Sequence, residues 1–360
     1  MLGPGSRGHG IDEGITVDTS ARADHLPADA DDLGVPAGPP ARRTTKLAVV
    51  GAGSVGSTMA YAALMRGAAR SVALYDINAA KVEAEALDIG HGIQFMPMAD
   101  VVGSDDIEVC AGADVVVVTA GAKQKPGQTR LDLAEATIGL VRSILPRLVE
   151  VAPEAVYVMV TNPVDIVTYA ALKISGLPPN QLFGSGTVLD SSRLRYLLAQ
   201  HTGVAVQNIH AYIAGEHGDS EIPLWSSATI GSVPLTQWPG IPGPLGVTGR
   251  LEAADRQRIA EEVMTSAYKI IAGKGATNYA VALAGSRIIE AVLNDERRVL
   301  PVSSLLEDYL GISDVCMSVP SIVGRQGVSA RLEVSMSDEE LSGLRQSADA
   351  LRAVARQFGL

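Results

Sequence analysis

The sequence is short of cysteine, aromatic residues and long apolar runs, and each shortage excludes a class of protein. Its only cysteines, Cys110 and Cys316, are too few for a disulfide framework or a zinc cluster, and they favour a reducing, cytoplasmic setting. No uninterrupted apolar run approaches the ~20 residues that a membrane-spanning helix needs. The N-terminal residues also lack the basic head and apolar core of a signal peptide.

The net charge excludes further classes of partner, and the aromatic content indicates how the core is built. The net charge of −11 argues against a nucleic acid or an anionic membrane surface as the partner. Aromatic residues make up only 4% of the 360 residues, so the cores must be built from Ala, Val, Leu and Ile. That composition suits parallel strands that are covered by helices on both faces.

From Lys46 onward, short apolar runs alternate with helical stretches. The expected strands are residues 47–50, 71–76, 113–119 and 155–160. The expected helices between them are the Ala-rich stretch up to Gly67, residues 79–90 and residues 129–150. This rhythm predicts an α/β protein with a doubly wound parallel-sheet Rossmann domain at residues 44–186.

The rhythm changes after about residue 186, and residues 187–360 are expected to form an α+β substrate and catalytic domain. The expected helices there are residues 188–202, 252–272, 276–295 and 337–358. The strand-like runs are residues 209–214 and 315–322. The Pro- and Gly-rich stretch 239–249 is expected to be a surface loop.

Residues 1–43 are rich in Gly, Pro and Asp and show no strong hydrophobic period. This composition predicts a disordered N-terminal extension. An arm that contacts another subunit and a misassigned start are the alternatives.

A glycine-rich turn follows the first expected strand and opens the first expected helix. Gly51, Gly53 and Gly56 form the pattern G-x-G-x-x-G, and Asp76 lies 20 residues after Gly56 at the end of the next strand. The glycines allow a pyrophosphate to approach the helix N terminus, where free N–H groups and the dipole favour anions. Asp76 would bind the adenosine ribose hydroxyls and repel a 2′-phosphate, so the pattern predicts NAD rather than NADP. A tight structural turn followed by a solvated aspartate is the alternative.

The expected strands at residues 113–119 and 155–160 end in short polar turns. Thr119-Ala120-Gly121 follows one of them and Thr161-Asn162-Pro163 follows the other. Ligands of open α/β sheets bind at the carboxyl ends of the strands, so both turns are expected beside the reactive half of the cofactor. Purely structural turns would use the same residue types.

Two segments in the second half carry candidate catalytic side chains. Asp190 and Arg193 are three residues apart in an expected helix and therefore share a face, while Arg195 points about 200° away from Arg193. A surface ion pair with a separate arginine is the alternative. His217 lies in a turn between glycines and acids, which suits a general acid/base. A metal ligand would need partners, and no His-x-x-x-His or cysteine lies near.

The motifs around these residues resemble those of the lactate/malate dehydrogenase family. The matching segments, in the order and spacing of the family, are residues 51–56, 119–130, 161–165, 189–193 and 215–219. The resemblance extends from about Lys46 to the C terminus. It implies an NAD-dependent oxidoreductase that acts on a small 2-hydroxy acid.

The resemblance also implies a role for each catalytic candidate. Protonated His217 would donate to the carbonyl oxygen of pyruvate, with NADH as the source of hydride. Asp190 would orient the imidazole and raise its pKa. Arg193 would clamp the substrate carboxylate with two parallel hydrogen bonds. Arg130 would polarise the carbonyl from a mobile lid at residues 122–130.

Further binding residues follow from the same resemblance. The substrate pocket is expected to be completed by Asn162 and Thr277. The expected cofactor contacts are Gly51, Gly53, Val55, Gly56, Asp76, Lys81, Thr119, Ala120, Gly121, Ala122, Ser143, Asn162 and Ser185.

Gln124 is the residue on which the choice of substrate rests. Members of the family that act on malate carry an arginine at this place, where it pairs with the second carboxylate of oxaloacetate. An uncharged Gln124 would leave that carboxylate unpaired in a closed site, whereas the methyl group of pyruvate needs no partner. The sequence therefore predicts the interconversion of pyruvate and L-lactate. If the family's motif is matched to this sequence one residue earlier or later, Lys123 or Lys125 takes this place. Malate dehydrogenase activity is therefore the first alternative. An inactive NAD-binding regulator is the second.

Arg195 and His210 match a regulatory pair of the family. In its allosteric bacterial members this pair binds fructose 1,6-bisphosphate across a subunit interface. The resemblance thus implies activation by fructose 1,6-bisphosphate and assembly into a homotetramer. The alternative is a structural arginine with a satisfied histidine in the 209–214 strand.

Overall fold

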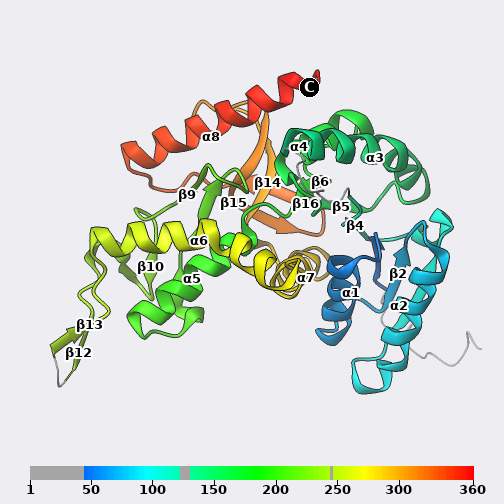
Figure 1. The fold of residues 1–360 in the computed structure, drawn as a ribbon, viewed down its shortest axis with the longest axis horizontal. Coiled ribbons are helices and arrows are strands. Elements are labelled where there is room, and N and C mark those ends of the chain that lie inside the picture. The colour runs from blue at the N-terminus through cyan, green and yellow to red at the C-terminus, as the bar shows by residue number, and fades with distance from the viewer. Residues whose placement is uncertain (1–43, 122–129, 244–245) are drawn as a thin grey trace, which may run out of the picture. The chain divides into compact units, whose positions relative to one another are not determined.

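A computed structural model of the protein describes residues 44–121, 130–243 and 246–360 (Figure 1). The expected extension at residues 1–43 and most of the expected lid, residues 122–129, therefore lie outside the described residues. None of the helices in the described ranges is long and apolar enough to cross a membrane.

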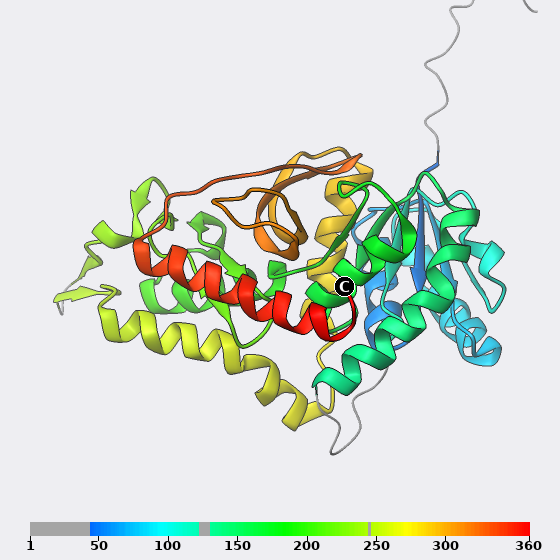
Figure 2. The same cartoon turned by 90° about the horizontal axis from the view of Figure 1, so that it is seen from above.

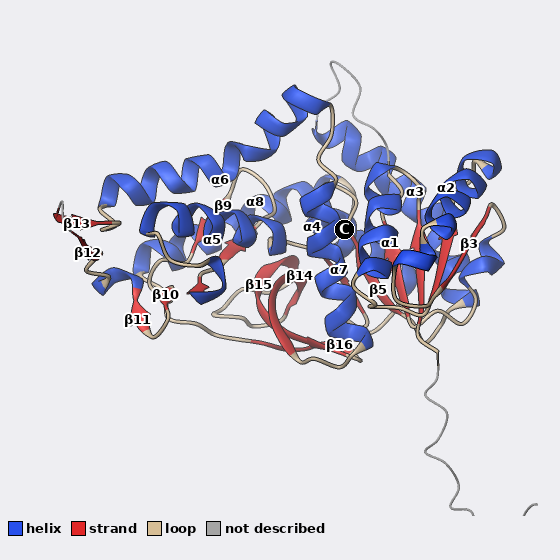
Figure 3. Ribbon diagram, turned by 90° about the horizontal axis from the view of Figure 1, so that it is seen from below, coloured by secondary structure: helices blue, strands red, loops and turns tan. Residues whose placement is uncertain are grey.

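The first half of the described chain forms a parallel sheet with connecting helices. Its strands are β1 (Lys46–Val50), β2 (Ser71–Tyr75), β3 (Asp100–Ser104), β4 (Val115–Val118), β5 (Val156–Met159) and β6 (Leu182–Gly184). Its helices are α1 (Ser54–Met65), α2 (Ala79–His91), α3 (Arg130–Val151) and α4 (Val164–Ser175). The strands lie in the order β3-β2-β1-β4-β5-β6, and each pair of neighbours is parallel. Figure 3 shows these strands among α1, α2 and α3.

Both faces of this sheet are covered, because successive side chains of a strand point to opposite faces. Leu47 and Val49 of β1 belong to one core cluster, together with buried residues of α1, α2 and α7. Ala48 and Val50 of the same strand belong to a second cluster, together with buried residues of α3, α4 and α8. The expected doubly wound Rossmann sheet is confirmed.

The second half combines long helices with antiparallel strands. Its helices are α5 (Val188–Thr202), α6 (Ala253–Lys274), α7 (Tyr279–Leu293) and α8 (Asp338–Gln357). Its strands are β7 (Ile209–His210), β8 (Ile213–Gly215), β9 (Glu221–Pro223), β10 (Thr229–Ile230), β11 (Val233–Pro234), β12 (Ile241–Gly243), β13 (Gly246–Thr248), β14 (Arg298–Leu306), β15 (Val315–Gly324) and β16 (Gly327–Arg331). The short 3₁₀ helices of the chain are η2 (Ile93–Phe95), η3 (Ile107–Cys110), η4 (Val206–Asn208) and η5 (Leu235–Gln237). The expected α+β character of this half is confirmed.

The main sheet does not stop where the parallel strands end. β14 pairs antiparallel with β6 at Ser303 and Gly184, and the sheet continues in the order β14-β15-β8-β9 with β16 on β15. Helix α8 packs against β8, β9 and β15, and it is the red helix of Figure 2. The continuous sheet thereby brings loops of the second half to the edge of the cofactor half; a domain boundary at residue 186 remains a prediction.

Two expectations about the second half are wrong. The expected strand 209–214 is split, because β7 pairs with β10 in a three-stranded sheet while β8 belongs to the main sheet. Residues 239–249 are not simply a loop, because β12 and β13 form a hairpin there. Across its base the indole of Trp238 donates to the carbonyl of Gly249 at 2.9 Å, a bond that composition does not reveal.

Candidate active site

The glycine turn between β1 and α1 is too crowded for side chains at two of its three glycines. Gly51 has φ +102°, and a Cβ there would lie 2.7 Å from the backbone nitrogen of Ala120. A Cβ on Gly56 would lie 1.9 Å from the carbonyl oxygen of Gly51. At Gly53, in contrast, a Cβ would meet nothing within 4 Å. The turn therefore packs tightly on the protein side and is open above Gly53, where a ligand backbone can approach.

The helix that follows presents an unsatisfied N terminus. Gly53 is the N-cap residue of α1 and provides no side-chain cap, and the first turn carries no acidic residue. The free N–H groups and the helix dipole at this end favour a phosphate group.

Asp76 lies beside the turn at the end of β2. Its Oδ2 accepts a hydrogen bond from the backbone nitrogen of Ala52 at 2.8 Å, and its Oδ1 accepts one from Asn78 at 3.0 Å. A carboxylate has about four acceptor sites, so further sites remain for ribose hydroxyls. These residues fit an NAD dinucleotide: the turn for its pyrophosphate and Asp76 for its adenosine ribose.

The polar ends of β4 and β5 join the same turn. The hydroxyl of Thr119 donates to the carbonyl oxygens of Val50 at 3.1 Å and Gly51 at 2.9 Å. The hydroxyl of Thr161 donates to Ala120 at 2.8 Å. A Cβ on Gly121 would meet Thr161 Cγ2 at 2.0 Å. The three strand ends are therefore locked together, and the exposed Asn162 follows directly on this cluster.

The remaining expected cofactor contacts are spread more widely. Val55 lies in the first turn of α1, and the backbone nitrogen of Ser185 donates to Met159 at the end of β5. Lys81 and Ser143 are exposed on α2 and α3, and the hydrogen bonds described for them stay at their own helices. Ala122 lies outside the described residues.

Three of the catalytic candidates meet around one buried carboxylate. Asp190, in the first turn of α5, is 2% exposed. Its Oδ2 lies 2.5 Å from Nδ1 of His217 on the loop after β8, and its Oδ1 accepts a bond from Arg193 Nη1 at 2.6 Å. The alternative of a surface ion pair is excluded by this burial.

Within this cluster, His217 and Asp190 each shift the pKa of the other toward the charged form. Burial lowers the pKa of His217, but the charge and hydrogen bond of Asp190 outweigh it, and the resulting pKa is about 9. Burial raises the pKa of Asp190, but His217 and Arg193 lower it below its ordinary value. At neutral pH the pair is thus an imidazolium and a carboxylate.

Arg195 serves a different environment from Arg193, as their helical spacing predicts. Its Nε donates to the carbonyl oxygen of Ala211 at 2.8 Å, and its guanidinium lies 4.8 Å from the ring centroid of Tyr212. His210 is exposed on β7 nearby.

Two further acidic residues of the site, Asp165 and Glu221, have no role in the predictions from the sequence. Asp165 of α4 accepts a hydrogen bond from the backbone nitrogen of His217 at 2.8 Å. Glu221 of β9 is paired in register with Gly215. Burial and the neighbouring Asp190 raise the pKa of Glu221 to about 8, against the opposing effects of His217 and Arg193. The available signals were the end of the 161–165 motif and an acid four residues after His217.

Some expected substrate contacts are placed only by the backbone or not at all. Helix α3 begins at Arg130, whose side chain is outside the described part of the structure, and Gln124 also lies outside the described residues. Thr277 lies in the short connection between α6 and α7.

Two family models match this chain, and together they span both halves of the fold. The model described as lactate/malate dehydrogenase, NAD binding domain, matches residues 45–184. The model described as lactate/malate dehydrogenase, alpha/beta C-terminal domain, matches residues 187–358.

Individual relatives agree with this assignment. The chain is 60% identical over 317 residues to an L-lactate dehydrogenase of Bifidobacterium animalis subsp. lactis (strain AD011). The matched stretch covers 88% of this chain and 98% of that relative. It is 44% identical over 315 residues to an L-lactate dehydrogenase of Thermoanaerobacter sp. (strain X514), with 88% and 99% covered.

Solved structures give the same picture. The minor L-lactate dehydrogenase from Enterococcus mundtii, in its ligands-bound form, matches with a TM-score of 0.82 and 38% identity over 87% of this chain and 98% of that chain. A lactate dehydrogenase from a Medee basin deep-sea metagenome library matches with a TM-score of 0.84 and 34% identity, covering 88% and 100%.

Proposed function

This chain belongs to the lactate/malate dehydrogenase family and binds NAD, and we propose that it is a cytoplasmic L-lactate dehydrogenase that interconverts pyruvate and L-lactate. The observation that carries the proposal is the buried Asp190, which holds His217 on one oxygen and Arg193 on the other. This arrangement places a proton donor and a carboxylate-binding cation side by side. The relatives named above as L-lactate dehydrogenases support the choice of substrate.

The proton chemistry follows from the hydrogen bonds of His217. Since Nδ1 is bonded to Asp190, Nε2 is the ring nitrogen left to face a substrate. In the reduction of pyruvate, His217 gives its Nε2 proton to the carbonyl oxygen, and in the oxidation of L-lactate it takes the hydroxyl proton back. Bound NADH supplies the hydride that the carbonyl carbon receives. Asp190 stays ionised throughout and stabilises the imidazolium.

Substrate binding is assigned chiefly to Arg193. Its Nη1 is engaged by Asp190, which orients the guanidinium and leaves its other N–H groups for the carboxylate of pyruvate. Arg130, Asn162 and Thr277 are proposed to complete the pocket, with Arg130 polarising the carbonyl group.

The choice of pyruvate over oxaloacetate is proposed to rest on Gln124. NADH oxidation followed at 340 nm should give a kcat/KM for pyruvate at least about 100-fold above that for oxaloacetate, because Gln124 offers no charge to the second carboxylate. Gln124→Arg should shift this ratio toward oxaloacetate by a similar factor. Gln357→Arg, at an exposed glutamine in the last turn of α8, is the control and should leave the ratio unchanged. Comparable rates with both acids in the unaltered enzyme would contradict lactate dehydrogenase activity.

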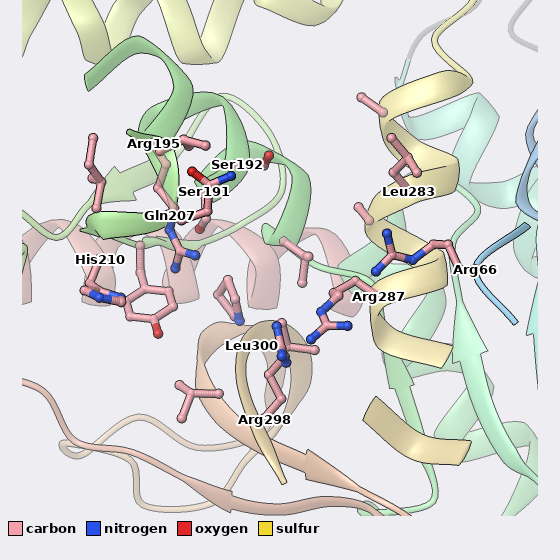
Figure 4. A pocket seen from close by; sticks show the side chains of 18 residues that line it. Arg66, Ser191, Ser192, Arg195, Gln207, His210, Leu283, Arg287, Arg298 and Leu300 are labelled. Atoms are coloured by element: carbon pink, nitrogen blue, oxygen red, sulfur yellow. The ribbon is translucent and has the colours of Figure 1, made fainter. Parts of the chain in front are cut away.

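We also propose that fructose 1,6-bisphosphate activates the enzyme through a cavity between α5 and α7. This cavity has a volume of about 630 Å³, and Figure 4 shows Arg195 and His210 on one side of it and Arg66, Arg287 and Arg298 on the other. The arginines suit the phosphate groups of such an effector. Among the described residues Arg195 has no acidic partner, so its charge remains for a ligand. We further propose a homotetramer, in which a second subunit would complete the effector site.

Removal of Arg195 tests this regulation. In the unaltered enzyme the bisphosphate should lower KM for pyruvate, and Arg195→Ala should weaken this response by about tenfold or more because a charge-assisted phosphate contact is lost. Arg356→Ala, at an exposed arginine of α8, is the matched control and should respond normally. Light scattering of the protein as it elutes from a size-exclusion column measures the mass of the assembly and tests the homotetramer. An Arg195→Ala enzyme with the full response would refute the effector site.

A further inference from the structure

A buried carboxylate that the proposed chemistry does not use lies directly behind His217. Asp165 is 1% exposed, and its Oδ2 accepts the backbone N–H of His217 at 2.8 Å. Its Oδ1 is also buried and has no hydrogen-bond partner among the described residues. The nearby hydroxyl of Ser303 lowers the pKa of Asp165, although it makes no hydrogen bond of ordinary geometry.

A purely structural role does not account for this residue. A buried charge with an unpaired oxygen is costly, and replacing such groups by well-packed neutral residues is often neutral or stabilising. The neighbouring residues Val164 and Ser303 are tightly packed, since a Cβ on Gly184 would meet Val164 Cγ2 at 2.9 Å and Ser303 Cβ at 3.2 Å. The carboxylate is thus held where its only described hydrogen bond goes to the backbone of His217.

Asp165 connects two loops that both face the site. It is the second residue of α4, which begins directly after Asn162 and Pro163, and it reaches a residue 52 positions away. Asp190 holds the ring of His217 at Nδ1, whereas Asp165 holds its backbone nitrogen. The histidine is therefore anchored at two points by two carboxylates.

The charge of Asp165 also acts on the imidazole. Burial and the nearby Glu216 raise the pKa of Asp165 to about 6, against the opposing effects of Ser303 and His217. The carboxyl group is thus mostly ionised at neutral pH. Its negative charge adds to that of Asp190 in raising the pKa of His217.

We propose that Asp165 is a positioning residue for His217, which fixes the histidine backbone and whose negative charge favours the protonated imidazole. The inference rests on the proposed function, because it assigns Asp165 to the proton donor of that reaction. It makes separate predictions for the charge and for the backbone anchor.

Two variants separate these contributions. Asp165→Asn keeps an acceptor oxygen for the His217 N–H but removes the charge, whereas Asp165→Ala removes both. In both variants the midpoint of the His217 imidazole titration, followed by NMR, should fall by about 0.5 to 1 pH unit. The alkaline limb of kcat/KM for pyruvate should fall with it. At low pH, where the imidazole is protonated, kcat should stay within about threefold in Asp165→Asn and fall about tenfold or more in Asp165→Ala.

Glu290→Gln is the matched control, because Glu290 is a buried carboxylate of α7, 5% exposed, that pairs with Arg66 just after α1 and with Arg287 of α7. It should lower the melting temperature without moving the His217 midpoint.

An unmoved midpoint in folded Asp165→Asn would overturn the electrostatic role, and equal kcat values in the two variants would overturn the anchor. If Asp165→Ala does not fold, Asp165→Asn and its NMR midpoint still decide the electrostatic role. Failure of the unaltered enzyme to reduce pyruvate would overturn the proposed function instead, and the NMR midpoint would still test Asp165.

Discussion

Replacement of His217 by glutamine is expected to lower kcat for pyruvate reduction by about 10²- to 10⁴-fold, the usual contribution of a positioned general acid. The amide of glutamine can donate a hydrogen bond to the carbonyl oxygen, but it cannot transfer a proton at neutral pH. The glycine turn and Asp76 remain in place in this variant, so NADH should bind with nearly unchanged affinity. Absorbance at 340 nm measures turnover, and quenching or enhancement of NADH fluorescence measures binding.

His201→Gln provides the control for this experiment. His201 lies on α5 like Asp190, and its Nε2 contacts the carbonyl oxygen of Arg250 at 2.7 Å. A glutamine there should leave kcat within about twofold, because the residue has no part in proton transfer. A His217→Gln enzyme that keeps more than a tenth of the normal kcat would rule out His217 as the proton donor.

The second large effect is expected from Asp190→Asn. With the carboxylate gone, burial of His217 is no longer outweighed, and its pKa should fall from about 9 toward or below its ordinary value of 6.5. Because the reaction needs the imidazolium form, kcat/KM for pyruvate at pH 8 should drop by about 30-fold or more. Arg193 also loses the partner that orients it.

The pH profile shows the sign of this effect. The unaltered enzyme should hold its kcat/KM for pyruvate through neutral pH and lose it above about pH 9, where His217 loses its proton. In Asp190→Asn the same loss should begin below about pH 7, so that part of the activity returns in acid. Asp255→Asn is the control, since Asp255 lies 3.9 Å from the nitrogen of His201 in a partly exposed pair. A profile of unchanged shape in Asp190→Asn would show that Asp190 does not set the protonation of His217.

Expectations based on local patterns agree closely with the structure. The helix expected at 188–202 is observed as Val188–Thr202, and that at 79–90 as Ala79–His91. The glycine turn also lies between a strand and a helix, as its pattern requires. Such features depend on residues within one or two turns of each other, so the periodicity of the sequence reports them directly.

Other elements leave no such pattern and were missed. Strand β3 is an edge strand with two exposed residues, and β6 is only three residues long. In β14 the buried Ser303 and Ser304 interrupt the apolar run that would mark a strand. The split of residues 209–214 depends on two different sheets competing for one segment, and local propensity carries no information about that choice.

The candidate active site likewise has features that follow from local sequence and features that depend on the tertiary structure. The sequence by itself determined the glycine turn, the pairing of Asp190 with Arg193 on one helix face and the chemical type of His217, because each depends on local spacing or residue chemistry. Only the tertiary structure decided that His217 meets Asp190 across 27 positions and Asp165 across 52. Those contacts exist because the antiparallel strands β14, β15 and β8 extend the parallel sheet past β6 and carry the His217 loop to the ends of α4 and α5. The shift of the His217 pKa arises from that assembly, since it depends on burial and on charges that only the folded chain brings together.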